Sequence, residues 1–104
     1  MIKRPLEGIR VIGLEQYMAG PYCTMLLADA GAEVIKIEDP TNPDIARMWG
    51  RGDTEELTAD PKLRNAPGGG GSAFTQLNRG KKSVTLNPTK PEGNKILHEL
   101  IKHI

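Results

Sequence analysis

The stretch that decides the fold begins with Ile9-Arg10-Val11-Ile12-Gly13-Leu14, a short apolar run rich in β-branched residues. Gly8 precedes this run and the polar pair Glu15-Gln16 follows it, so the run predicts a buried strand. A second run of the same kind, Val34-Ile35-Lys36-Ile37, is closed by Glu38-Asp39-Pro40 and predicts a second strand.

The segment between these two runs has the pattern of a helix. Apolar residues at positions i, i+3, i+4 and i+7 predict one buried stripe, made of Cys23, Leu26, Leu27 and Ala30. Pro21 suits the first turn of a helix and Gly31 suits the position just past its end, so we expect a helix over residues 21–30. A strand, a helix and a strand with tight joins form a βαβ unit with parallel strands and a right-handed crossover.

Beyond this unit the chain first loses its apolar period. Ten of the thirty-two residues 40–71 are Gly or Pro. This composition predicts a long loop, which we place at residues 39–73. Loops of this length are uncommon in compact domains and are often functional. Residues 74–77 fit one helical turn, and Ser83-Val84-Thr85-Leu86 predicts a third strand.

The last segment predicts a helix that begins near Pro91. Its apolar stripe consists of Ile96, Leu97, Leu100, Ile101 and Ile104. A strand and a helix without a return strand form an unusual end for a domain. The expected fold is therefore α/β, the N-terminal part of a doubly wound, Rossmann-like parallel sheet with a βαβ unit, a long loop and a further βα pair. We expect residues 1–104 to be an incomplete part of a larger domain.

Composition excludes several classes of protein. The 14 Lys and Arg residues nearly balance the 13 Asp and Glu residues, whereas nucleic-acid-binding domains are usually strongly basic. Cys23 is the single cysteine, so no internal disulfide and no Cys/His zinc motif can form. No segment has the apolar run of a signal peptide or of a membrane span. We expect a cytoplasmic protein with no metal, nucleic-acid or membrane partner.

Two segments are candidates for anion binding. Residues 15–21 lead from the first strand into a helix N-terminus, where unpaired N–H groups attract phosphates and carboxylates, although a plain turn that joins strand to helix explains this stretch better. Residues 78–83 hold Arg79, Lys81 and Lys82 around Gly80, which suits a polyanion such as a nucleotide diphosphate or CoA. The alternative for this basic cluster is a charged strand edge that discourages aggregation.

The spacing of the remaining conspicuous residues indicates no catalytic or ligand-binding role. Residues 68–71 are four glycines without the Lys of a phosphate-binding loop, and a flexible spacer explains them better. Cys23 lies on the predicted stripe, where a free cysteine acts as a small hydrophobic residue. His98 and His103 are five residues apart and do not share a helix face. No acid, base or nucleophile can be assigned from spacing.

Two long motifs nevertheless resemble one family. The first runs from Pro5-Leu6-Glu7-Gly8 through Met18-Ala19-Gly20-Pro21 to Gly31-Ala32-Glu33-Val34-Ile35-Lys36-Ile37-Glu38. The second is Asn78-Arg79-Gly80-Lys81-Lys82-Ser83-Val84-Thr85-Leu86-Asn87 with Pro91-Glu92-Gly93. Both are similar to the start of the family III CoA-transferases (CaiB/BaiF), which include formyl-CoA transferase, carnitine CoA-transferase and alpha-methylacyl-CoA racemase.

The resemblance implies an enzyme built as an interlocked homodimer. In the transferases an aspartate attacks the acyl-CoA thioester, an acyl anhydride and then an enzyme–CoA thioester follow, and CoA passes to a carboxylic acid. The racemase branch instead moves the α-proton of an acyl-CoA. In both branches the catalytic residues lie C-terminal of residue 104, so no catalytic residue is expected in this chain, and we expect the 104 residues alone to be inactive.

The resemblance also implies which residues contact CoA. They are Met18 and Ala19 after the first strand, and Leu86, Asn87, Pro88 and Thr89 after the third. Two positions depart from the family pattern: Asp39 stands where formyl-CoA transferase has an arginine, and Asn87 stands where an aspartate is usual. A phosphate contact must then come from elsewhere, and the candidates are Lys81, Lys82 and Lys90.

Three functional hypotheses follow. The first is part of the CoA site of a CoA-transferase that uses an acyl-CoA and a carboxylic acid. The second is the racemase branch of the same family. The third is a non-catalytic module of the α/β class that binds CoA or a nucleotide, and a broken reading frame without a stable fold is a further alternative.

Overall fold

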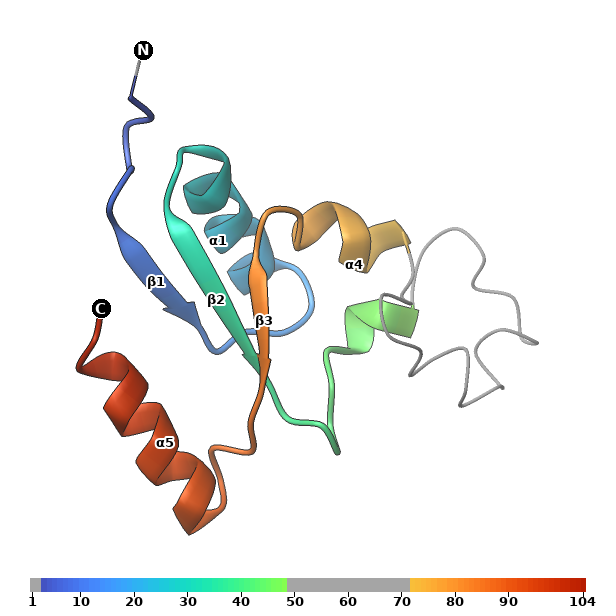
Figure 1. The fold of residues 1–104 in the computed structure, drawn as a ribbon. Coiled ribbons are helices and arrows are strands. Elements are labelled where there is room, and N and C mark those ends of the chain that lie inside the picture. The colour runs from blue at the N-terminus through green and yellow to red at the C-terminus, as the bar shows by residue number, and fades with distance from the viewer. Residues whose placement is uncertain (1–2, 49–71) are drawn as a thin grey trace.

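The computed structural model of the protein describes residues 3–48 and 72–104. Three strands and three helices, with one 3-10 turn, form these parts of the chain (Figure 1). In chain order they are β1 (Arg10–Gly13), α1 (Ala19–Asp29), β2 (Glu33–Glu38), η1 (Ile45–Met48), α4 (Ser72–Leu77), β3 (Lys82–Thr85) and α5 (Pro91–Ile101).

The strands form one parallel sheet in the order β1-β2-β3. Val11 pairs with Val34 and Ile37 pairs with Val84, so β2 is the central strand. The predicted βαβ unit, the further βα pair and their parallel strands are confirmed, and each strand boundary differs from the prediction by one residue.

Helices cover both faces of the sheet. Val11 packs with α1, and because side chains alternate along a strand, its neighbour Arg10 points to the opposite face. There Arg10 Nη1 donates to the carbonyl oxygen of His103 at 3.0 Å, so the chain just after α5 lies on that face. Helices on the two sides of a parallel sheet confirm the doubly wound class.

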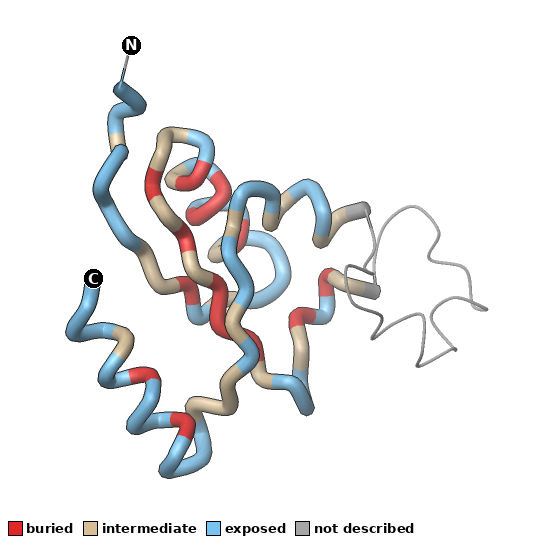
Figure 2. Tube along the Cα trace, viewed as in Figure 1, coloured by how far each residue is buried: buried red, intermediate tan, exposed pale blue. Residues whose placement is uncertain are grey.

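The core lies between α1 and the sheet (Figure 2). Ala28, Ala32 and Val34 form its buried cluster, with partly buried side chains packed around them from Leu6, Val11 and Leu27. Small residues at the contact let the helix approach the strands closely. The core of the described residues is therefore small, and Val34 at 1% exposure is its centre.

The predicted stripe of α1 is wrong. The buried residues of the helix are Pro21, Thr24, Met25 and Ala28, whereas Cys23 is exposed and Leu26 is 49% exposed. Both stripes have the same helical spacing and differ only by a two-residue offset. Periodicity cannot choose between them; in the structure the small Ala28 packs in the core cluster with Val34, and the Thr24 hydroxyl binds Glu15.

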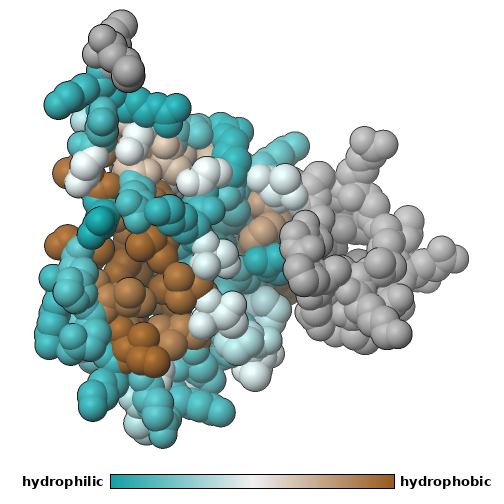
Figure 3. All heavy atoms as spheres, in the orientation of Figure 1, coloured by the Kyte–Doolittle hydropathy of each residue, from teal (hydrophilic) through white to brown (hydrophobic). Residues whose placement is uncertain are grey.

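The predicted stripe of α5 is only partly buried. Gly93 and Leu97 are buried, but Ile96, Ile101 and Ile104 remain about half exposed. Figure 3 shows a broad apolar area on this side of the molecule. Little apolar surface is therefore buried by α5, in contrast to α1.

The loop expected over residues 39–73 is not irregular throughout. Its first part contains η1, and its last residues begin α4, which is longer than the single turn predicted. The four glycines at 68–71 lie outside the described residues. Residues 44–47 are ordered because their charged side chains bind to β2, as described below.

Candidate functional site

Three segments that are distant in sequence meet at the carboxyl edge of the sheet. They are the turn after β1, the end of β2 and the segment after β3, and they enclose a cavity of about 430 Å³. The cavity is lined by Leu14, Glu15, Gln16, Ile37, Glu38, Asp39, Asn42, Pro88 and Thr89. In open α/β sheets ligands bind outside the carboxyl ends of the strands, which makes this cavity the candidate site.

The turn after β1 is held by side chains from elsewhere in the fold. Glu15 accepts hydrogen bonds from the Thr24 hydroxyl at 2.7 Å and from Lys81 Nζ at 2.7 Å. The backbone N–H of Tyr17 donates to Asp44 Oδ1 at 2.9 Å, and Gln16 Nε2 donates to the carbonyl of Asn42 at 3.2 Å. Every residue from 15 to 17 therefore has a fixed partner outside the turn.

Met18 and Ala19 follow this turn and begin α1. Met18 is 56% exposed and precedes the helix without a side-chain cap, while its carbonyl accepts the N–H of Tyr22 at 2.7 Å. Ala19 is exposed at the first helical position. Both predicted contact residues are accessible beside the cavity, although its lining comes from Glu15 and Gln16 on the same turn.

The segment after β3 is also well ordered. The N–H of Leu86 donates to the carbonyl of Glu38 at 2.8 Å and extends the pairing of the sheet. Asn87 Oδ1 accepts the N–H of Thr89 at 3.0 Å, which forms a tight turn ahead of α5. Pro88 and Thr89, the last two residues of the predicted set, line the cavity directly.

The structure separates the three lysines that the sequence grouped as phosphate contacts. Lys81 is 2% exposed and paired with Glu15, and burial lowers the pKa of its ammonium below the usual value. Lys82 lies at the start of β3, opposite Ile35 and away from the carboxyl edge, where it pairs with Glu33 at 3.2 Å. Lys90 stands just before α5, next to the cavity-lining Thr89.

The carboxylates of the cavity are also partnered. Burial would raise the pKa of Glu38, but Arg47 at 2.6 Å and other donors outweigh it and hold that pKa below the usual value. The pKa of Asp39 is lowered chiefly by the Thr41 hydroxyl, and the charge of Lys90 adds to the effect. The carboxylates Glu38 and Asp39 of the cavity lining are therefore already bound by a guanidinium and a hydroxyl of the fold.

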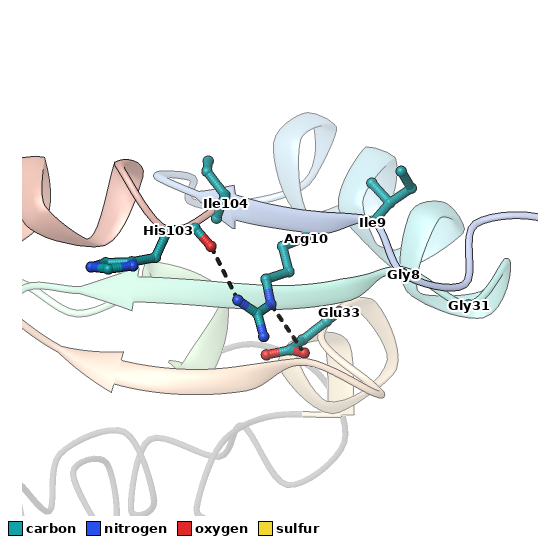
Figure 4. A pocket seen from close by; sticks show the side chains of 7 residues that line it. All are labelled: Gly8, Ile9, Arg10, Gly31, Glu33, His103 and Ile104. Carbon is teal, nitrogen blue, oxygen red and sulfur yellow. Dashed lines mark hydrogen bonds and ion pairs between the residues drawn. The ribbon is translucent and has the colours of Figure 1, made fainter.

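A second cavity of about 420 Å³ lies at the opposite end of the sheet (Figure 4). Arg10 crosses it, with Nε 3.7 Å from a carboxylate oxygen of Glu33 and Nη1 bonded to the carbonyl of His103. These contacts tie the end of α5 to the start of β1. No residue of the predicted CoA set lines this cavity.

Metal and membrane features are not found in the described ranges. Residues 3–48 and 72–104 contain no cluster of three His, Cys, Asp or Glu side chains suited to a metal ion. No helix within those ranges is long and apolar enough to cross a membrane.

Local sequence patterns do not reveal the residues that build the supporting layer beneath the turn. They are Lys36, Asp44, Arg47 and Asn78. One signal was available: Lys36 interrupts an otherwise apolar strand, and a lysine at such a position requires a buried partner. The identity of that partner could not be read from spacing, because Asp44 lies in the expected loop.

Comparison with known proteins now identifies the family. The model of CoA-transferase family III matches residues 6–104. Succinyl-CoA--D-citramalate CoA-transferase of Chloroflexus aurantiacus is 39% identical over 97% of this chain, which covers 22% of that protein. Succinyl-CoA:glutarate CoA-transferase of Mus musculus is 40% identical over 93% of this chain and is covered over 19% of its length.

The solved structures agree with the sequence relatives. A CAIB/BAIF family protein from Brucella suis superimposes with a TM-score of 0.74 and 32% identity, over 96% of this chain and 24% of that one. The chain thus spans about a fifth of the length of the curated relatives it matches. Since the family match extends over nearly all of its residues, the chain belongs to CoA-transferase family III.

Proposed function

We propose that this chain supplies part of the CoA-binding site of an enzyme that transfers CoA from an acyl-CoA to a carboxylic acid. The observation that carries the proposal is the cavity at the carboxyl edge, where residues of the β1–α1 turn and of the segment after β3 meet. Family membership and the names of the relatives, which are CoA-transferases, support the choice of ligand and reaction. Those names favour the transferase branch over the racemase branch.

Each part of the site has a distinct role in this proposal. Backbone groups of Met18 and Ala19, and of Leu86, Asn87, Pro88 and Thr89, would contact CoA along the edge of the cavity. Lys90 would meet a phosphate, because it lies next to the cavity-lining Thr89, whereas Lys81 is buried against Glu15 and Lys82 pairs with Glu33. Lys81 would support the turn through Glu15, and Lys82 would remain at the far end of β3.

The chemical step is assigned to residues outside this chain. Glu15 and Glu38 are held in ion pairs and Asp39 is bound by Thr41, so the carboxylates lining the cavity are engaged in structure. The family's aspartate nucleophile is expected beyond residue 104, in an interlocked cytoplasmic homodimer. We therefore expect the 104-residue chain to bind CoA and to show no transfer of CoA between an acyl-CoA and a free acid.

Calorimetric titration of the purified chain with CoA, ATP and inorganic phosphate tests the binding proposal. CoA should bind more tightly than ATP, because the pantetheine arm adds contacts that a generic anion site lacks. Ala19→Trp should weaken CoA binding at least tenfold, since the indole would occupy the exposed start of α1.

His98→Trp is the matched control. It introduces the same side chain at an exposed position of α5 and should leave CoA affinity unchanged. Equal affinity for CoA and ATP would instead support the non-catalytic anion-binding module. An equal loss of CoA affinity in the two tryptophan variants would show that the β1–α1 turn is not part of the CoA site.

A further inference from the structure

Buried charges of both signs lie directly beneath the β1–α1 turn. The side chains of Lys36 and Lys81 are each 2% exposed, and their partners Asp44 and Glu15 are 0% and 6% exposed. Burying ions is unfavourable unless each one is paired and hydrogen-bonded. Two lysines and two carboxylates make the cluster neutral, and Asn78 supplies a shared acceptor.

These five side chains form one continuous chain of hydrogen bonds. Lys81 Nζ contacts Glu15 Oε1 at 2.7 Å and Asn78 Oδ1 at 2.9 Å. Lys36 Nζ contacts the same Asn78 Oδ1 at 2.9 Å and Asp44 Oδ2 at 2.6 Å.

The chain of hydrogen bonds returns to the turn from which it started. The other oxygen of Asp44, Oδ1, accepts the backbone N–H of Tyr17 at 2.9 Å. Glu15 and Tyr17 are two residues apart, so the turn and the five side chains close into a ring. The ring also anchors the turn to β2, to the residue before η1 and to the turn before β3.

The backbone at Tyr17 needs such a constraint. Its φ is 77°, and Tyr17 is the only residue other than glycine with positive φ in the described ranges. A bulky side chain disfavours this left-handed conformation, which persists where surrounding contacts impose it. The hydrogen bond from Tyr17 N–H to Asp44 supplies one such contact immediately before Met18 and Ala19.

We infer that Asp44, held in place within this buried ring, positions the CoA-contacting start of α1, because its carboxylate fixes the backbone of Tyr17 and therefore the direction of Met18 and Ala19. The inference rests on the proposed function for its ligand, but its structural part concerns the turn alone. Asp44 is 1% exposed and needs no contact with CoA to act in this way. Its carboxylate acts through the backbone of Tyr17.

Two double variants separate the hydrogen bond to Tyr17 from the stability of the buried ion pair. Lys36→Met/Asp44→Asn removes both charges and keeps an acceptor oxygen for the N–H of Tyr17. Lys36→Met/Asp44→Ala removes the same charges and the acceptor together. The readouts are amide exchange at Tyr17, Met18 and Ala19, amide exchange at β2 as a measure of folding, and CoA affinity.

The asparagine variant should keep the exchange rate of Tyr17 and the affinity for CoA within about threefold of the unaltered chain. The alanine variant should exchange about tenfold faster at Tyr17 and bind CoA about tenfold more weakly, as expected for one lost hydrogen bond. Exchange at β2 should be the same in both variants. If Asp44 had a purely structural role, amide exchange would rise in parallel at β2 and at the turn, and this result would overturn the inference.

The remaining outcomes are also decisive. If the unaltered chain binds no CoA while Tyr17 responds as expected, the proposed function fails and the ring still positions the turn. If both variants bind CoA with equal affinity although Tyr17 exchanges faster in the alanine variant, the inference that Asp44 positions the turn for CoA is overturned. If the alanine variant does not fold, amide exchange in the unaltered chain tests the inference instead. Slow exchange of the Tyr17 amide would support it, whereas rapid exchange of that amide while the β2 amides stay protected would overturn it.

Discussion

Gly93 shows how a single residue fixes the relation between α5 and the candidate site. An added Cβ at this position would lie 1.8 Å from the carbonyl oxygen of Asn87 and 2.7 Å from its carbonyl carbon. Those atoms belong to the backbone and cannot rotate away as a side chain could. The first turn of α5 therefore rests directly on the segment that contributes Pro88 and Thr89 to the cavity.

We expect Gly93→Ala to destabilise the chain by about 1–3 kcal/mol, because overpacking against the Asn87 carbonyl exceeds the gain of about 1 kcal/mol in helix propensity. The same change should weaken CoA binding by displacing Pro88 and Thr89. Urea unfolding and calorimetry measure the two effects. His98→Ala, an exposed change on the same helix, should alter stability by less than about 0.5 kcal/mol. A Gly93→Ala chain more stable than the unaltered one would contradict the close packing.

The central strand β2 is the element that joins the core to the charged layer. Val34 faces α1, and on the same face Lys36 and Glu38 follow at every second residue. Lys36 pairs with Asp44 at 2.6 Å and Glu38 pairs with Arg47 at 2.6 Å. Two ion pairs therefore hold the η1 region against the sheet, and the guanidinium of Arg47 lies 3.8 Å from the ring centroid of Phe74 in α4.

These pairs predict a loss of stability in acid. Burial would raise the pKa of Asp44, but hydrogen bonds from Lys36, Tyr17 and Ala46 outweigh it and hold that pKa below its usual value, and the pKa of Glu38 is lowered as well. Carboxylates with lowered pKa stabilise the fold above their unfolded pKa, so this stability is lost as pH falls below about 4. Denaturant unfolding at pH 7, 5 and 3.5 measures it.

Lys36→Met/Asp44→Asn provides the control for this pH dependence. Because this variant lacks the Asp44 carboxylate, whose pKa is lowered by folding, its free energy of unfolding should fall less between pH 5 and pH 3.5 than that of the unaltered chain. If the free energy of unfolding fell equally in the two proteins between pH 5 and pH 3.5, Asp44 would not contribute to the acid sensitivity.

The sequence predicted elements better than it predicted contacts. The alternation and helical spacing of β1, α1 and β2 are local properties, and these elements form where expected. The buried face of α1 was wrong because two stripes share one spacing and only the packed sheet distinguishes them. The contact of Lys36 with Asn78 spans 42 residues, and no local pattern reveals such a partner. For the same reason Lys81 was expected to face a phosphate, although the fold pairs it with Glu15.

The molecule as a whole has two unequal faces. On the α1 face Ala28, Ala32 and Val34 are all buried, and the charged layer continues the packing toward the carboxyl edge. On the α5 face Ile96, Ile101 and Ile104 remain about half exposed. Burial of apolar surface stabilises a fold roughly in proportion to the area removed from water. Within residues 3–48 and 72–104, most of the stabilising burial therefore lies between α1 and the sheet.

This asymmetry predicts very different costs for trimming one apolar side chain on each face. Val34→Ala removes two buried methyl groups and leaves a cavity between α1 and β2, so it should lower the free energy of unfolding by about 2 kcal/mol. Ile96→Ala removes more atoms from a side chain that is already 52% exposed and should cost less than about 1 kcal/mol. Urea unfolding with equal m-values compares the two directly. Equal losses would mean that α5 packs on the sheet as firmly in solution as α1 does, and the candidate site would then rest on two cores instead of one.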